Sequence, residues 1–170
     1  PFGGIEGIVL IDLLKQKRKD AKVLANFILA RVPQIKEQII SVDPFGSESS
    51  SRNNISPMKN SLKLLKTGGL LAIFPSGTVS HFQLQKKGVA DPEWNDDVAR
   101  LIRKSNATVV PIFFEGRNKL FFQILGMIHP ILRTLMLPRE LLSKRNKTIK
   151  LSIRKPIDAK QLISLETDKE

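Results

Sequence analysis

The chain has 170 residues, a length that suits one domain with a sizeable buried core. Its apolar fraction of 41% is that of an ordinary globular protein, and the absence of cysteine excludes disulfide bonds and thiolate metal sites. Because His81 and His129 are far apart and are the only histidines, we expect no metal and no other cofactor. The net charge of +12 predicts an acidic partner: nucleic acid, an anionic membrane surface or an acidic carrier protein.

Predicted helices and strands alternate in the first half of the chain. A glycine-rich stretch leads into an apolar helix, and β-branched runs predict the strands that follow. Pro33 limits a second helix, and a segment rich in Ser, Asn and Gly reads as a loop. The predicted order is helix 5–17, strand 22–26, helix 28–35, strand 39–43, loop 44–56 and helix 57–66.

The second half continues this alternation. The apolar run LLAIF predicts a buried central strand, and Asp91 and Pro92 are typical of a helix start, as N-cap and first helical residue. Pro111 indicates an edge strand or a bulge. The predicted order is strand 70–74, helix 91–105, strand 108–114, an apolar segment 120–137, strand 148–154 and helix 158–165. Together these elements predict one α/β domain over residues 1–170, with a mixed, largely parallel central sheet flanked by helices.

The positive charge is concentrated in two clusters, which are either solvated surface or binding sites for an acidic partner. The first cluster comprises Lys15, Lys17, Arg18, Lys19 and Lys22, and the second comprises Arg139, Lys144, Arg145, Lys147, Lys150, Arg154 and Lys155.

Candidate functional residues lie in three stretches. The glycine loop before helix 5–17 presents backbone N–H groups at a helix N-terminus, where Glu6 is also favoured as a simple cap. FPSGTVSH and VVPIFFEGRN each end a predicted strand, and ligands of open α/β sheets gather at such carboxyl ends. Ser76 lacks the G-x-S-x-G setting of a nucleophile, and His81 reads as a loop residue rather than a base. The substrate-binding candidates are Gly3, Gly4, Phe74, Pro75, Ser76, Gly77, Thr78, Gly116, Arg117 and Asn118.

These stretches resemble those of the glycerolipid acyltransferases, the lysophosphatidate-acyltransferase-like family. PFGGIEG is similar to the family's Asn-His-Pro block without its first two residues, and FPSGTVS is similar to its Phe-Pro-Glu-Gly-Thr-Arg-Ser block. VVPIFFEGRN resembles the Val-Pro-Val block. Its ending, with KGVADPEW and LPRELLSKRNKT, is typical of the branch labelled hemolysin or ornithine-lipid acyltransferase.

The resemblance implies a catalytic histidine just before Pro1, with Glu6 as its carboxylate partner. The histidine would take the proton of a lysolipid hydroxyl as it attacks an acyl thioester of acyl-carrier protein or of CoA. Backbone N–H groups near Gly3 and Gly4, or near Ser76 to Thr78, would bind the oxyanion. The chain as printed, without the histidine, is expected to be inactive. The family implies a peripheral protein on the cytoplasmic face of the membrane.

The chain departs from the family pattern at positions that affect the substrate. The acid is Glu instead of Asp and lies one residue further from the histidine, and Ser76 replaces a glutamate. Val79 replaces an arginine linked with binding of a glycerol phosphate. We therefore expect an acceptor other than simple lysophosphatidate, or a phosphate held by Arg117 or Arg52.

The apolar segment 120–137 allows three interpretations: a pair of core helices, the wall of an acyl-chain tunnel, or a surface that dips into the bilayer. Two other function classes stay open. A nucleic-acid-binding module is supported by the charge, but tyrosine is absent and Trp94 lies among acids. A membrane-lytic hemolysin is not favoured, because a compact α/β core gives no route to a pore.

Overall fold

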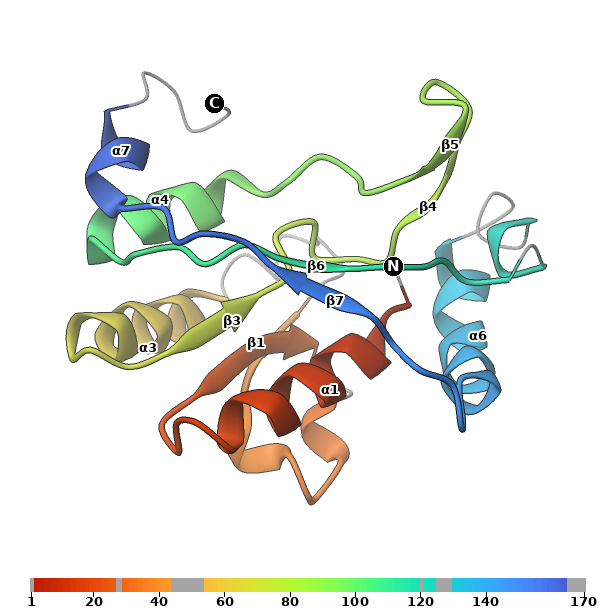
Figure 1. Cartoon of the computed structure of the whole chain (residues 1–170), viewed down its shortest axis with the longest axis horizontal. Helices are drawn as coiled ribbons and strands as arrows, with labels where there is room; N and C mark the ends of the chain where they lie inside the picture. Colours follow the sequence, from red (N-terminus) through yellow and green to blue (C-terminus); the bar gives the residue numbers. More distant parts are fainter. Residues whose placement is uncertain (1, 27–28, 44–53, 120, 125–129, 165–170) are drawn as a thin grey trace.

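A parallel three-stranded sheet lies at the centre of the computed structural model, which describes residues 2–26, 29–43, 54–119, 121–124 and 130–164 (Figure 1). Strand β1 (Lys22–Asn26) runs between β2 (Ile39–Val42) and β3 (Leu71–Ile73). In this register Val23 pairs with Ile39 on one side and with Ala72 on the other. The predicted α/β fold with a largely parallel sheet is therefore confirmed.

Helices pack on this sheet and form its core. Helix α1 (Gly4–Lys15) packs on β1, and α3 (Ile55–Lys66) packs on β2 and β3. The alternation of β1 turns Val23 and Ala25 inward, because successive strand side chains point to opposite faces. The core cluster comprises Ile11, Val23, Ala25 and Ile35, with Ile8, Leu29, Ile39, Ala72 and Phe74 packed against it.

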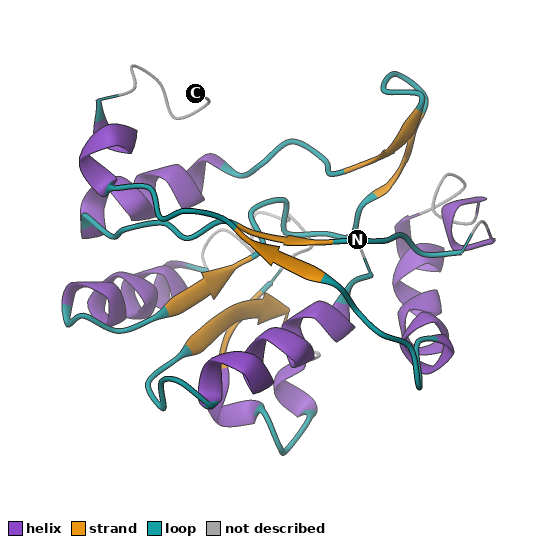
Figure 2. Ribbon diagram, viewed as in Figure 1, coloured by secondary structure: helices purple, strands orange, loops and turns teal. Residues whose placement is uncertain are grey.

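Two antiparallel strand pairs accompany the parallel sheet (Figure 2). The first pair is β4 (His81–Gln83) with β5 (Gly88–Ala90), and the second is β6 (Ile112–Phe114) with β7 (Leu151–Ile153). The remaining helical elements are η1 (Leu29–Arg31), η2 (Lys36–Gln38), α4 (Asp96–Ser105), α6 (Pro130–Ser143) and α7 (Ala159–Ile163).

The turn between α1 and β1 shows how part of the first basic cluster is used. Arg18 donates to both carboxylate oxygens of Asp20, at 2.9 and 2.5 Å, and to the carbonyl of Gly68 at 2.7 Å. The hydrogen bond from Arg18 lowers the pKa of Asp20. This cation therefore ties two surface turns together.

Several local predictions were wrong. No α-helix spans the described part of residues 28–35, where η1 precedes the turn at Pro33. Strand β3 flanks β1 at one side of the three-stranded sheet and is half-buried, so it is not the central strand. The β4–β5 hairpin was not predicted, and His81 lies in a strand of it rather than in a loop.

Helix α4 begins four residues later than predicted, with its N-cap at position 95 and not at position 91. The Asp91 carboxylate accepts a hydrogen bond from the Ser80 hydroxyl, so it closes the hairpin instead of capping a helix. Asn95 is the N-cap in its place, and its side chain accepts from the backbone N–H of Asp97 at 2.8 Å.

Parts of two predictions lie outside the described residues. Residues 44–53 of the predicted loop, with Arg52, are among these, and α3 begins at Ile55. The described part of segment 120–137 has a helical turn at 121–124 and the start of α6. None of the helices in the described ranges is both long and apolar enough to cross a bilayer.

Candidate active site

Glu6 lies in the first turn of α1 and is only 4% exposed. One of its carboxylate oxygens accepts from the backbone N–H of Phe2 at 3.1 Å, and the other accepts from Gly3 at 3.2 Å. Both N–H groups lie at the N-terminal end of α1, where a side-chain acceptor replaces the missing intrahelical partners. Glu6 is therefore a helix cap in this structure, and it fixes the path of the chain that enters α1.

Gly3 adopts a backbone conformation that suits glycine, with φ of 86° and ψ of −139°. A Cβ atom at this position would lie 2.7 Å from Leu137 Cδ2 and 3.0 Å from Val79 Cγ2. The segment after β3 thus reaches the start of α1 through Val79, and α6 reaches it through Leu137. Val79, which stands where the resembling family has an arginine, therefore makes an apolar contact with Gly3.

The segment after β6 contacts Phe2, the residue before Gly3. Gly116 has a φ of 124°, and a Cβ there would lie 2.3 Å from Phe2 Cζ, so only glycine admits the phenyl ring. Asn118 is 2% exposed and donates from Nδ2 to the Phe2 carbonyl at 3.3 Å. Its Oδ1 has no hydrogen-bond partner among the described residues. All three predicted stretches therefore meet at Phe2 and Gly3.

The turn after β3 is closed by its own hydrogen bonds. The Gly77 N–H donates to the Phe74 carbonyl at 2.9 Å, and the Ser76 hydroxyl donates to the Thr78 carbonyl at 2.9 Å. Gly77 has a φ of 64°, which this turn requires. The Phe74 ring packs on the core beside Gly7, and the Pro75 carbonyl accepts from the N–H of Asn95. Ser76 is therefore a turn residue, as the sequence indicates.

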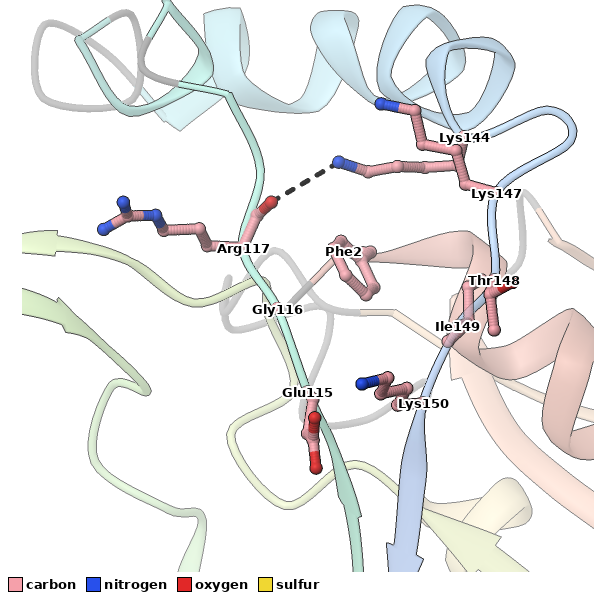
Figure 3. Close-up of a pocket in the computed structure, with 9 residues that line it drawn as sticks. All are labelled: Phe2, Glu115, Gly116, Arg117, Lys144, Lys147, Thr148, Ile149 and Lys150. Atoms are coloured by element: carbon pink, nitrogen blue, oxygen red, sulfur yellow. Dashed lines mark hydrogen bonds between the residues drawn. The ribbon is translucent and has the colours of Figure 1, made fainter.

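A pocket of about 360 Å³ opens next to Phe2, between the segment after β6 and the segment before β7 (Figure 3). Arg117 contributes to its wall, but the guanidinium group points away from it (Figure 3). Its backbone carbonyl instead accepts from Lys144 Nζ at 3.4 Å. The pocket is lined by Phe2, Glu115, Gly116, Arg117, Lys144, Lys147, Thr148, Ile149 and Lys150.

Sequence reasoning missed the contributions of Phe2, Glu140 and the lysines of this pocket. The three lysines belong to the second basic cluster. The sequence allows two interpretations of that cluster, solvated surface or a binding site. The four-residue spacing of Glu140 and Lys144 was the available signal, because such a pair faces the same side of a helix. The roles of the ten predicted substrate-binding residues stay predictions.

Comparison with known proteins supports the resemblance that the sequence motifs indicate. The profile of a family described as "Acyltransferase" matches residues 1–169. The lyso-glycine lipid O-acyltransferase of Phocaeicola vulgatus is 29% identical in an alignment 168 residues long, which covers 92% of this chain and 56% of that protein. The chain thus spans about half the length of this relative. No solved structure shows significant similarity. From the match over nearly all of its residues, the chain belongs to the acyltransferase family.

Proposed function

We propose that this chain forms the acyl-transfer domain of an O-acyltransferase that acts on the hydroxyl group of a lysolipid. The observation that carries the proposal is the match to a lyso-glycine lipid O-acyltransferase along 92% of the chain. The meeting of three separate stretches at Phe2 and Gly3 supports it, because family members place their reacting groups in such blocks.

The proposed base is a histidine immediately upstream of Pro1. Its Cα would lie within about 7.6 Å of the Phe2 Cα, because consecutive Cα atoms are ~3.8 Å apart. Glu6 binds the N–H of Phe2, so its carboxylate is in the right part of the structure to pair with that imidazole. A carboxylate oxygen has two acceptor sites, which allows the cap and the catalytic contact to share the same group.

In the proposed reaction the histidine takes the proton of the acceptor hydroxyl. At the same time the hydroxyl oxygen forms a bond to the thioester carbonyl carbon. The carbon–sulfur bond then breaks, and the thiolate receives the proton from the imidazolium. Because the Gly3 N–H donates to Glu6 and the Gly77 N–H donates to the Phe74 carbonyl, the proposed oxyanion donors are the N–H groups of Gly4 and Ser76. The acyl donor is acyl-carrier protein or acyl-CoA, with no cofactor.

The proposal includes peripheral attachment to the cytoplasmic face of an anionic membrane. Phe121 is 53% exposed, and Leu142 is 73% exposed and lies within the second basic cluster in the sequence. The Arg139 guanidinium carbon lies 5.6 Å from the centre of the Phe121 ring. Apolar side chains beside cations suit the interface of an anionic bilayer.

The decisive experiment measures acyl transfer by the full-length gene product. Acyl-carrier protein and CoA thioesters are offered against a panel of lysolipids that begins with lyso-glycine lipid, and products are read by mass spectrometry. In Glu6→Gln the amide oxygen keeps one of the two capping hydrogen bonds, the other N–H loses its acceptor, and the negative charge is lost. We expect kcat to fall by roughly 10²- to 10⁴-fold and the unfolding free energy to fall by about 1–3 kcal/mol. The matched control is Asp158→Asn, which removes the charge of the cap of α7.

Two results would count against the proposal. One is the absence of product with every donor and acceptor. The other is a Glu6→Gln enzyme with wild-type kcat, which would leave Glu6 with the capping role alone. If both carboxyl variants lose activity and melt at lower temperature, Glu6→Asp settles the matter, since it retains the charge and should recover more activity than the amide.

A further inference from the structure

The pocket beside Phe2 is lined by cations that the proposed chemistry does not use. Its volume of about 360 Å³ is at the small end for ligand sites and suits a polar head group. Lysines line it from the connection that follows α6 and from the segment that leads into β7 (Figure 3). Its position matters because Phe2 lines it while the Phe2 N–H binds Glu6.

Lys144 is held in place at the wall of the pocket. Its Nζ lies 3.7 Å from Glu140 Oε2, 3.4 Å from the Arg117 carbonyl and 4.7 Å from the centre of the Phe2 ring. Glu140 is itself 4% exposed and accepts from the backbone N–H of Lys119 at 3.5 Å. A buried carboxylate thus fixes one cation over the aromatic ring that borders the proposed reaction centre.

Lys147 and Lys150 are placed differently, because both side chains are exposed at the mouth of the pocket. Within the described residues neither of them forms an ion pair. Glu115 is the one carboxylate in the pocket lining, against three ammonium groups there. The Lys144 charge is balanced by Glu140, so the two exposed lysines outnumber the single Glu115 and favour an anionic ligand.

We propose that this pocket binds the acidic head group of the acceptor lysolipid, an inference that rests on the proposed acyl transfer. Lys147 and Lys150 contact the anion, and the Lys144–Glu140 pair borders the pocket beside Phe2. The head group then lies on one side of Phe2 and the reacting hydroxyl on the other. This arrangement would orient the acceptor without an arginine at position 79.

The charge of the pocket also selects among head groups. A glycine head group joined to the lipid through its nitrogen ends in a carboxylate, whereas one joined through its carboxyl group ends in an ammonium. Ammonium groups bind the first and repel the second. The pocket therefore favours an acceptor whose head group ends in an acid.

The test uses a binding measurement that does not depend on turnover. The full-length protein is titrated with a short-chain N-acylglycine that lacks the reacting hydroxyl, and with its methyl ester, which has nearly the same shape but no charge. We expect the acid to bind roughly ten- to a hundredfold more tightly than the ester. The double variant Lys147→Met with Lys150→Met should remove that difference, while Lys160→Met on the distant helix α7 should keep it.

Kinetics then separate the possible sources of the anion. With a hydroxylated N-acylglycine as acceptor, the double variant should raise KM for the acceptor about tenfold or more and leave KM for the acyl donor unchanged. A rise in the donor KM alone would overturn the proposal, because the pocket would then serve a phosphate of the donor. Equal binding of acid and ester to the wild type would also overturn it, whether or not acyl transfer occurs. If acid and ester differ as expected but no product forms, only the proposed reaction fails.

Discussion

Gly3 is the position where a single methyl group should be most disruptive. The change Gly3→Ala places a Cβ on a residue with φ of 86° and ψ of −139°, a conformation that L-residues rarely adopt. The same methyl would lie 2.7 Å from Leu137 Cδ2 and 3.0 Å from Val79 Cγ2, where carbon atoms normally stay ~3.5–4.0 Å apart. The added Cβ therefore has two independent energetic costs, one from the backbone conformation and one from the close contacts.

The two costs can be estimated separately. The unfavourable backbone conformation is worth about 1–3 kcal/mol, and overpacking adds about 1–3 kcal/mol. The expected loss of unfolding free energy is thus about 2–6 kcal/mol, a large part of the ~5–15 kcal/mol of a typical domain. Adding Leu137→Ala should recover part of the overpacking cost, but none of the backbone cost.

Urea unfolding followed by circular dichroism measures these differences. The control is Gly88→Ala in β5, where a Cβ would meet nothing closer than the Lys86 carbonyl at 3.7 Å. That change should alter the unfolding free energy by less than about 1 kcal/mol. The reasoning is refuted if Gly3→Ala lies within about 0.5 kcal/mol of the wild type, since even the lower estimate of the two costs exceeds that.

Two further predictions concern Asn118 and the membrane. Asn118→Ala leaves the Phe2 carbonyl without its side-chain donor and should lower the unfolding free energy by about 1–3 kcal/mol in urea; an unchanged midpoint would mean that this contact is dispensable. Phe121→Ser with Leu142→Ser should weaken co-sedimentation with anionic liposomes at least tenfold, because apolar area no longer enters the interface. Leu84→Ser is the control at the same 73% exposure as Leu142, and an equal loss there would remove the case for a defined membrane face.

Local patterns predicted the elements whose residues act through their immediate neighbours. Strand β1 has the predicted bounds because its alternation places Val23 and Ala25 in the core. Patterns failed where a distant contact competes with a local one. The carboxylate of Asp91 was predicted to cap a helix. It instead accepts a hydrogen bond from Ser80, which lies eleven residues earlier in the sequence. The sequence does not specify which of two suitable partners an Asp side chain will choose.

In the candidate site, too, some features were predictable from local sequence and others depend on distant contacts. The order of the three stretches, with two of them at the carboxyl ends of strands, indicated that they would meet, and the contacts at Phe2 and Gly3 show where. The orientation of Arg117 was not predictable, because an exposed guanidinium after a strand has many allowed rotamers. Asn118 was singled out by resemblance, but its burial against the Phe2 carbonyl depends on the whole fold.

Position 79 connects these observations with the choice of substrate. A methyl group of Val79 lies against Gly3, with Leu137 on the same side. This chain therefore has an apolar contact at the position where the family that it resembles has an arginine. On the far side of Phe2, Lys144, Lys147 and Lys150 border an open pocket, and Glu140 holds the first of them. An acidic acceptor is attracted to the pocket that these lysines border. Under the proposal, the α6–β7 connection, and not the turn after β3, therefore selects the head group.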